Sequence, residues 1–168
     1  MGIDARARRK GRCMADRFFR HLQASEGEVF QLGRITIIFK AGPKETLGAF
    51  TLCEAIEPPD SGAGSHRHGY DEVFRILEGR YEFEIGENGQ DKRMVCAGET
   101  LFVPGGTAHA FKSLGPGIGR QLIVSSPGGI FDAFISEVAT AMSGNDSSPK
   151  TGVDFRAIAA RHGLEFLS

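Results

Sequence analysis

The sequence predicts an all-β protein, with one barrel-like domain followed by a pair of helices. Glycine is the first indication, because 23 of the 168 residues are glycine, roughly twice the average usage, and no Gly-x-y repeat accounts for them. The second is a succession of short segments separated by Gly or Pro between positions 29 and 125. Strands spaced about 8–12 residues apart with turn signals between them are typical of sandwiches and barrels. The third is a change to helical periodicity after Gly129.

Eight segments in the first three-quarters of the chain are predicted as strands. Gly42-Pro43, Gly79, Gly98 and Gly115-Pro116-Gly117 are among the turn signals that separate them. The predicted strands are Ile35–Lys40, Ala49–Ile56, Asp71–Leu77, Arg80–Ile85, Lys92–Cys96, Thr100–Val103, His109–Ser113 and Arg120–Ser125.

Two helices are predicted in the last quarter. The first spans about 130–142, where one apolar stripe recurs at helical spacing. That stripe consists of Phe131, Phe134, Ile135, Val138 and Met142. The second spans about 154–162, since Thr151-x-x-Asp154 resembles a capping box and Gly163 stands where a helix-ending glycine belongs. We expect this pair to pack on the outside of the barrel and complete its core.

Length and charge set the domain organisation. We expect residues 1–28 to form a basic arm, flexible or a short helix, because seven of the first 20 residues are Lys or Arg. Residues 29–168 then form one domain, with the barrel at about 33–125. The formal net charge of the whole chain is -1, which argues against a general nucleic-acid binder.

Several classes of protein are excluded by composition. No apolar run approaches the roughly 18 residues of a membrane span. The basic N-terminal segment lacks the apolar stretch of a secretory signal. The three cysteines are too few and too scattered for a disulfide framework. These features predict a protein of a reducing intracellular compartment, the cytoplasm.

Three of the five histidines fall into one constellation. His66 and His68 are two residues apart, so on an extended segment both side chains point to the same face. Glu72 shares that parity, and we expect one strand to aim all three side chains into the barrel. Two histidines and a carboxylate are the ligands of sites that hold Fe(II) and similar ions. His109 follows the turn at 104–106 and is expected to take a fourth position.

The same residues carry a resemblance to a known superfamily. Residues 66–79 fit the pattern His-x-His-x3-Glu-x6-Gly, and residues 98–109 fit Gly-x5-Pro-x-Gly-x2-His. These patterns resemble the two motifs of the cupins, and the resemblance covers about 33–125. There are two departures: Asp60 stands where the first motif has a glycine, and Ser113 stands where the second has an asparagine.

The resemblance implies a cupin jelly-roll barrel of six to eight strands. It also implies that His66, His68, Glu72 and His109 bind one divalent metal ion inside the barrel. These ligands suit Fe, Mn, Co, Ni, Cu and Zn alike. Cupins commonly form dimers, so we expect a homodimer with Val29–Lys40 as its contact.

The overall layout, with one barrel and a C-terminal helix pair, resembles single-domain cupins described as quercetin 2,3-dioxygenase-like. This resemblance implies that a flavonol or similar enol is cleaved with O2. Glu72 is the candidate catalytic base, with a pKa that we expect burial to raise. Phe74 and Phe111 share the inward parity and would suit a flat aromatic substrate. Tyr70 either reaches the mouth of this pocket or caps the turn.

Two alternatives stay open at the level of sequence. One is a non-oxidative cupin isomerase or epimerase, which would require a cavity lined with polar groups. The other is a cupin that binds a small molecule without turnover. One scaffold supports many chemistries, so the fold alone does not choose among them.

Overall fold

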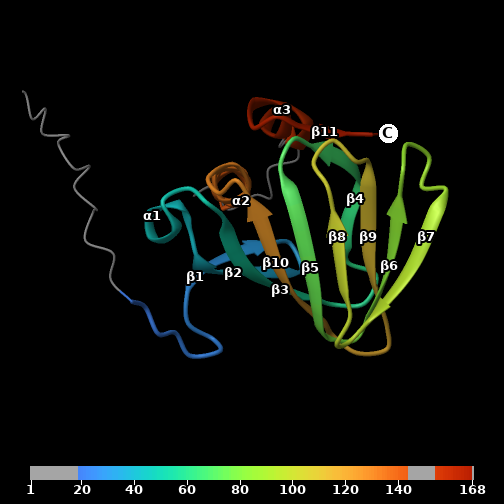
Figure 1. The fold of residues 1–168 in the computed structure, drawn as a ribbon, viewed down its shortest axis with the longest axis horizontal. Helices are drawn as coiled ribbons and strands as arrows, with labels where there is room; N and C mark the ends of the chain where they lie inside the picture. The colour runs from blue at the N-terminus through green and yellow to red at the C-terminus, as the bar shows by residue number, and fades with distance from the viewer. Residues whose placement is uncertain (1–18, 144–153, 168) are drawn as a thin grey trace, which may run out of the picture.

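The computed structural model describes residues 19–143 and 154–167 (Figure 1). Of the predicted basic arm, residues 1–18 lie outside the described residues, as does Thr151 of the predicted capping box. The described elements are β1 (Glu28–Leu32), β2 (Ile35–Ala41), α1 (Pro43–Thr46), β3 (Thr51–Glu57), β4 (Gly62–His68), β5 (Asp71–Glu78), β6 (Arg80–Ile85), β7 (Asp91–Cys96), β8 (Thr100–Val103), β9 (His109–Leu114), β10 (Gly119–Ser126), α2 (Ile130–Met142), α3 (Phe155–Arg161) and β11 (Leu164–Phe166).

The strands form two antiparallel sheets. One has the order β1-β2-β3-β10-β5-β8, and the other has the order β11-β4-β9-β6-β7. Figure 1 shows the two sheets folded over one another, with α2 and α3 on the same side of the molecule. The predicted all-β fold with C-terminal helices is therefore confirmed.

Four described elements were not predicted as separate units: β1, α1, β4 and β11. The last of these matters most for the interior, because β11 adds to the edge of β4, with Leu164 opposite His68 and Phe166 opposite His66. A segment of three residues is too short to show a periodicity, so pairing with a neighbouring strand decides whether it becomes a strand.

The barrel interior has layers, because alternate residues of each strand point inward. On β10 the inward residues are Ser125, Ile123 and Gln121, all of them buried. On β9, His109 contacts Glu72, which pairs with Ser125, and the ring of Phe111 packs on Phe74, which pairs with Ile123. An apolar layer thus separates two polar layers.

Backbone conformation explains one departure from the cupin pattern. Asp60 has a φ of 63°, in the left-handed region that favours glycine and that aspartate tolerates better than most residues. The Asp60 amide donates a hydrogen bond to the carbonyl of Ser113 at 2.9 Å. The two residues that depart from the cupin motifs are therefore in direct contact. Gly79 and Gly98, two of the predicted turn residues, also have a positive φ, 79° and 89°.

Helix α3 begins one residue later than predicted, because Asp154 is its cap. The Asp154 carboxylate accepts a hydrogen bond from the amide of Ala157 at 3.0 Å. None of the helices described here is both long enough and apolar enough to cross a membrane.

Candidate metal centre

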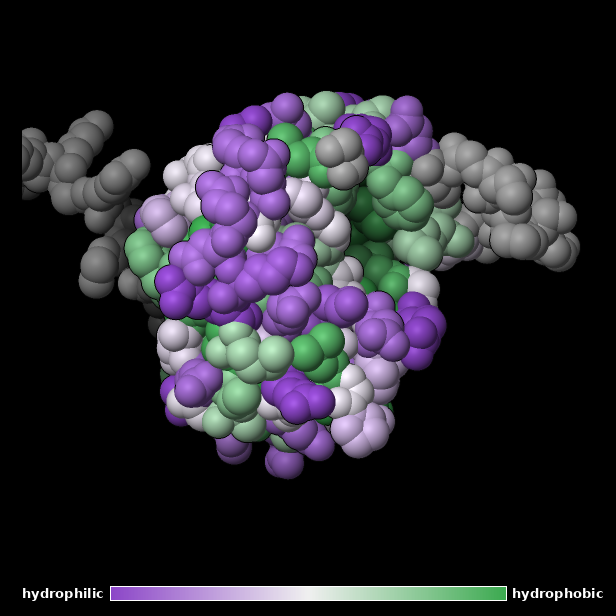
Figure 2. Space-filling model, turned by 90° about the vertical axis from the view of Figure 1, so that its right-hand side faces the viewer, coloured by the Kyte–Doolittle hydropathy of each residue, from purple (hydrophilic) through white to green (hydrophobic). Residues whose placement is uncertain are grey.

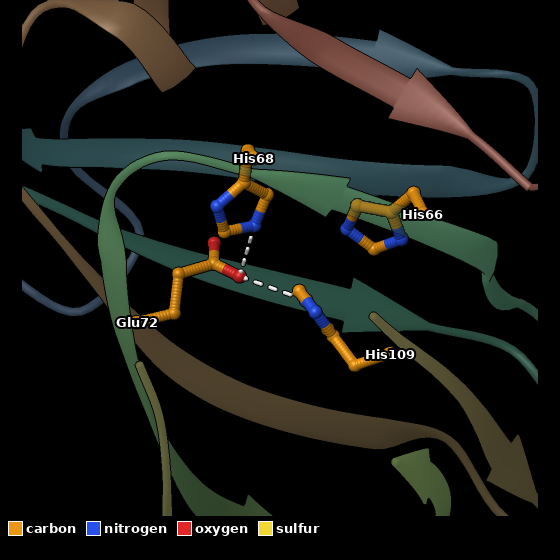
Figure 3. Close-up of side chains that lie close together, drawn as sticks. All are labelled: His66, His68, Glu72 and His109. Atoms are coloured by element: carbon orange, nitrogen blue, oxygen red, sulfur yellow. Dashed lines mark hydrogen bonds and ion pairs between the residues drawn. The ribbon is translucent and has the colours of Figure 1, made fainter. Parts of the chain in front are cut away.

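Four buried side chains meet inside the barrel: His66, His68, Glu72 and His109. One ligand atom from each lies within 4.8 Å of the others. Figure 3 shows the Glu72 carboxylate between the rings of His68 and His109, with His66 beside them. The Glu72 Oε2 atom lies 3.0 Å from His68 Nε2 and 3.2 Å from His109 Nε2.

The expectation that one strand carries three of these residues is wrong. His66 and His68 end β4, whereas Glu72 lies near the start of β5, in the opposite sheet. A turn at Gly69 and Tyr70 separates the two strands. The chain reverses between them, so the carboxylate faces the histidines from across the barrel.

The glycine-rich turn before β9 stabilises the chain reversal between β4 and β5. The amide of Gly106 donates to the carbonyl of His68 at 2.7 Å. The amide of Gly105 donates to the Asp71 carboxylate at 2.8 Å. A Cβ on Gly105 would lie 2.5 Å from the carbonyl oxygen of Gly69, so only glycine allows the two turns to approach this closely.

All three histidines are oriented in the same way. Each ring donates from Nδ1 to the backbone carbonyl of a residue two positions away: Gly64 for His66 at 2.8 Å, Tyr70 for His68 at 3.0 Å and Thr107 for His109 at 2.9 Å. In a neutral imidazole this leaves Nε2 with its lone pair. Such hydrogen bonds set the tautomer and ring direction of histidines that bind metal ions.

This arrangement fits a divalent cation. With Nδ1–H committed to a carbonyl, Nε2 of a neutral His68 or His109 is an acceptor, and it faces Glu72 Oε2, which is also an acceptor. Either each ring carries a second proton or a cation accepts all of these lone pairs. Three imidazole nitrogens and one carboxylate oxygen bind divalent transition metals. The four residues could therefore hold one metal ion.

The raised pKa expected for Glu72 is wrong. Burial by itself raises the pKa, but the contacts with His109 and His68 outweigh it and lower the pKa of Glu72 to about 2. The carboxylate is therefore ionised across the neutral range. Burial, with a smaller contribution from His109, lowers the pKa of His66 to about 4. At neutral pH His66 is thus uncharged, as a metal ligand must be.

A cavity of about 330 Å³ adjoins the cluster, and on one face of the molecule Figure 2 shows a hollow lined by hydrophobic side chains. His66 and Glu72 line the cavity, as do Tyr70, Phe74 and Phe111. Tyr70 is 2% exposed, and its ring stacks on His68 with a centroid distance of 3.6 Å.

Helix α2 forms one wall of this cavity. Its predicted apolar stripe lines the cavity at every position: Phe131, Phe134, Ile135, Val138 and Met142. The stripe was expected to complete the barrel core, and its part in a binding cavity could not be inferred from periodicity. Leu164 and Phe166 of β11 line the cavity as well.

The comparisons agree with this geometry. Residues 54–125 match the family model for the cupin domain, Cupin_2. The fold is cupin-like. The matched residues include all four residues of the cluster, whereas α2, α3 and β11 lie outside the match. No curated protein matches the chain by sequence.

Several solved structures share the fold of this barrel at low sequence identity. The polyketide cyclase RemF from Streptomyces resistomycificus is 18% identical, with a TM-score of 0.58 over 65% of this chain and 80% of its own. A predicted oxalate decarboxylase from Thermotoga maritima is 20% identical, with a TM-score of 0.59 over 64% and 99%. An RmlC-like cupin from Shewanella frigidimarina is 15% identical, with a TM-score of 0.54 over 66% and 92%.

Proposed function

We propose that the protein is a metal-dependent dioxygenase that cleaves a flavonol or a similar enol with O2. The observation that carries this proposal is an apolar cavity that opens onto a buried cluster of three histidines and a glutamate. Such a cavity suits a flat aromatic molecule, which would bring one oxygen-bearing edge to the cluster. A divalent ion held by the cluster would supply Lewis acidity and redox chemistry.

The side chains that line the cavity have separate roles in the proposed reaction. Glu72 lines the cavity and is placed to accept the proton of a substrate hydroxyl. Phe74 and Phe111 contact the rings of the substrate and exclude water from them. Tyr70, stacked on His68, holds that imidazole in its orientation.

The overall reaction balances with O2 as the oxidant. The flavonol carbon that bears the 3-hydroxyl group leaves with its oxygen as carbon monoxide, so the two ring C–C bonds to that carbon break. Each of the two carbons left behind forms a new bond to an oxygen atom from O2. Both oxygen atoms of O2 remain in the second product, an ester that bears a new carboxyl group. The proton taken up by Glu72 returns to that group.

The non-oxidative isomerase or epimerase is less consistent with this cavity. Sugars and related substrates require many hydrogen-bonding groups, and most of the side chains that line the cavity are apolar. A role in binding without turnover requires the same cavity, and only an activity measurement separates it from the enzyme.

The first test is elemental analysis of protein purified without chelator, followed by quercetin oxidation. We expect one Fe, Mn, Co or Ni ion per chain and one carbon monoxide released for each O2 consumed. Failure to bind any metal, even after reconstitution, would contradict both enzymatic functions. Metal binding without O2 uptake by any flavonol would contradict the dioxygenase and leave the binding role.

A further inference from the structure

A second buried carboxylate, Glu57 at the end of β3, lines the cavity. The side chains that line the described cavity include four that can ionise: His66, Glu72, Tyr70 and Glu57. The first two belong to the metal cluster, and Tyr70 stacks on it. Among these four ionisable side chains, Glu57 is thus the one that lies away from the cluster.

Glu57 is held in place by neutral partners. Its Oε2 atom accepts hydrogen bonds from the Tyr81 hydroxyl at 2.7 Å and from Gln121 Nε2 at 2.9 Å. The described residues provide no partner for Oε1 and no cation for the carboxylate. Glu57 is only 2% exposed and lines the cavity, so one oxygen of this carboxylate is left to bond with whatever enters the cavity.

The two carboxylates stand in different layers of the barrel. Ser125 Oγ lies 3.4 Å from Glu72, and Gln121 Nε2 lies 2.9 Å from Glu57. These two residues share the inward face of β10 and are four positions apart, which is about 13 Å along a strand. Ile123 lies between them and lines the cavity. A ligand that reached both polar layers would cross an apolar middle.

Small-molecule cavities use a few placed polar groups in an apolar wall to orient the ligand. We propose that Glu57 is a specificity-determining residue that binds a hydroxyl group of the substrate at the end of the cavity away from the metal cluster. This inference rests on the proposed function and names its substrate class more narrowly. The substrate is a flat aromatic molecule with one oxygen at the cluster and a hydroxyl on its distal part.

The protonation of Glu57 is consistent with this role. Burial raises the pKa of Glu57 to about 7, although Tyr81 and Gln121 act in the other direction. Around neutral pH the side chain is therefore present as both acid and carboxylate. Either form bonds to a hydroxyl, which both donates and accepts.

The test measures the affinity of the metal-loaded protein for matched flavonols under anaerobic conditions. The probes are 3-hydroxyflavone, 3,7-dihydroxyflavone and 3,4′-dihydroxyflavone, so that each dihydroxy compound adds one distal hydroxyl. We expect the wild-type protein to bind at least one dihydroxy compound about tenfold more tightly than 3-hydroxyflavone, as one hydrogen bond to an ionisable group predicts.

Two variants measure the contribution of Glu57 to this preference. Tyr81→Phe removes a hydroxyl that bonds to Glu57 but that does not itself line the cavity, so the tenfold preference should persist. Glu57→Met/Tyr81→Phe removes both partners of that bond, so no tyrosine hydroxyl is left unpaired and only Gln121 Nε2 loses its acceptor. In this double variant the preference should fall to about onefold, while the affinity for 3-hydroxyflavone stays the same.

The outcomes separate the inference from the proposed function. A preference that survives in the double variant, or equal wild-type affinity for all three probes, would overturn the assignment of Glu57 and leave the dioxygenase standing. If no flavonol binds to the wild-type protein, the proposed function itself fails, and the inference fails with it.

Discussion

Glu57 and Glu72 are two buried carboxylates that line one cavity and behave in opposite ways. Glu72 is 4% exposed and Glu57 is 2% exposed, so the cost of burying a charge is similar for both. The pKa of Glu72 is lowered to about 2, whereas the pKa of Glu57 is raised to about 7.

The partners make the difference. Glu72 Oε2 contacts the ring nitrogens of His68 and His109, which outweigh burial. Glu57 has a hydroxyl and an amide as partners, and neutral dipoles do not offset burial. One end of the cavity is therefore organised for a cation, and the other for a neutral polar group.

The largest expected effect follows from removing a ligand at the cation end. His66→Ala should reduce the bound metal about tenfold or more and abolish turnover, because one of four ligands is lost. Elemental analysis and O2 uptake measure both quantities. His21→Ala is the matched control, since His21 is exposed and lies outside the cluster. Full metal content in His66→Ala would refute the proposed ligand set.

Glu72→Gln separates metal binding from proton transfer at the same end. The amide is isosteric with the carboxylate but is a poor base, so we expect much of the metal to remain and kcat to fall by about a hundredfold or more. Loss of the metal would identify Glu72 chiefly as a ligand. Full turnover would remove it from the mechanism.

A smaller effect is expected between the two ends, on the wall formed by α2. Val138→Phe adds volume where Val138 lines the cavity, so KM for quercetin should rise about tenfold while the metal content stays unchanged. Thr140→Val, on the exposed face of the same helix, should leave KM unaltered. An unchanged KM in Val138→Phe would mean that the substrate does not use this wall.

The smallest effect concerns stability at the Glu57 end. The pKa of Glu57 is near 7 in the folded protein and near 4.5 in the unfolded chain, so the folded state holds its proton more tightly. Stability should therefore fall as pH rises from about 4.5 to about 7. Glu57→Gln should lose this component of the pH dependence and gain stability relative to wild type at pH 8.

Urea denaturation of both proteins at pH 5 and pH 8 measures this difference, and Glu28→Gln on the exposed side of β1 is the control. Parallel stability profiles for wild type and Glu57→Gln would show that Glu57 has the same pKa in both states.

Local patterns predicted much of the fold. Helix α2 and strands β6 and β8 have the bounds that periodicity and turn residues indicate. The four candidate ligands could be listed from their spacing and from the cupin motifs. Strand β11 and the split of the ligands between two sheets could not be predicted in this way, because they depend on long-range pairing.

The sequence by itself identified four candidate ligands, since the spacing and the two cupin-like motifs single out His66, His68, Glu72 and His109. Only the tertiary structure decided what surrounds them. Glu57 belongs to no sequence motif, and in the sequence it is simply an acidic residue at the end of a strand. Its burial, its neutral partners and its place on the cavity wall arise from strands far apart in the chain. Alternation along one strand predicts which face a residue takes, but not which residues of other strands lie opposite it.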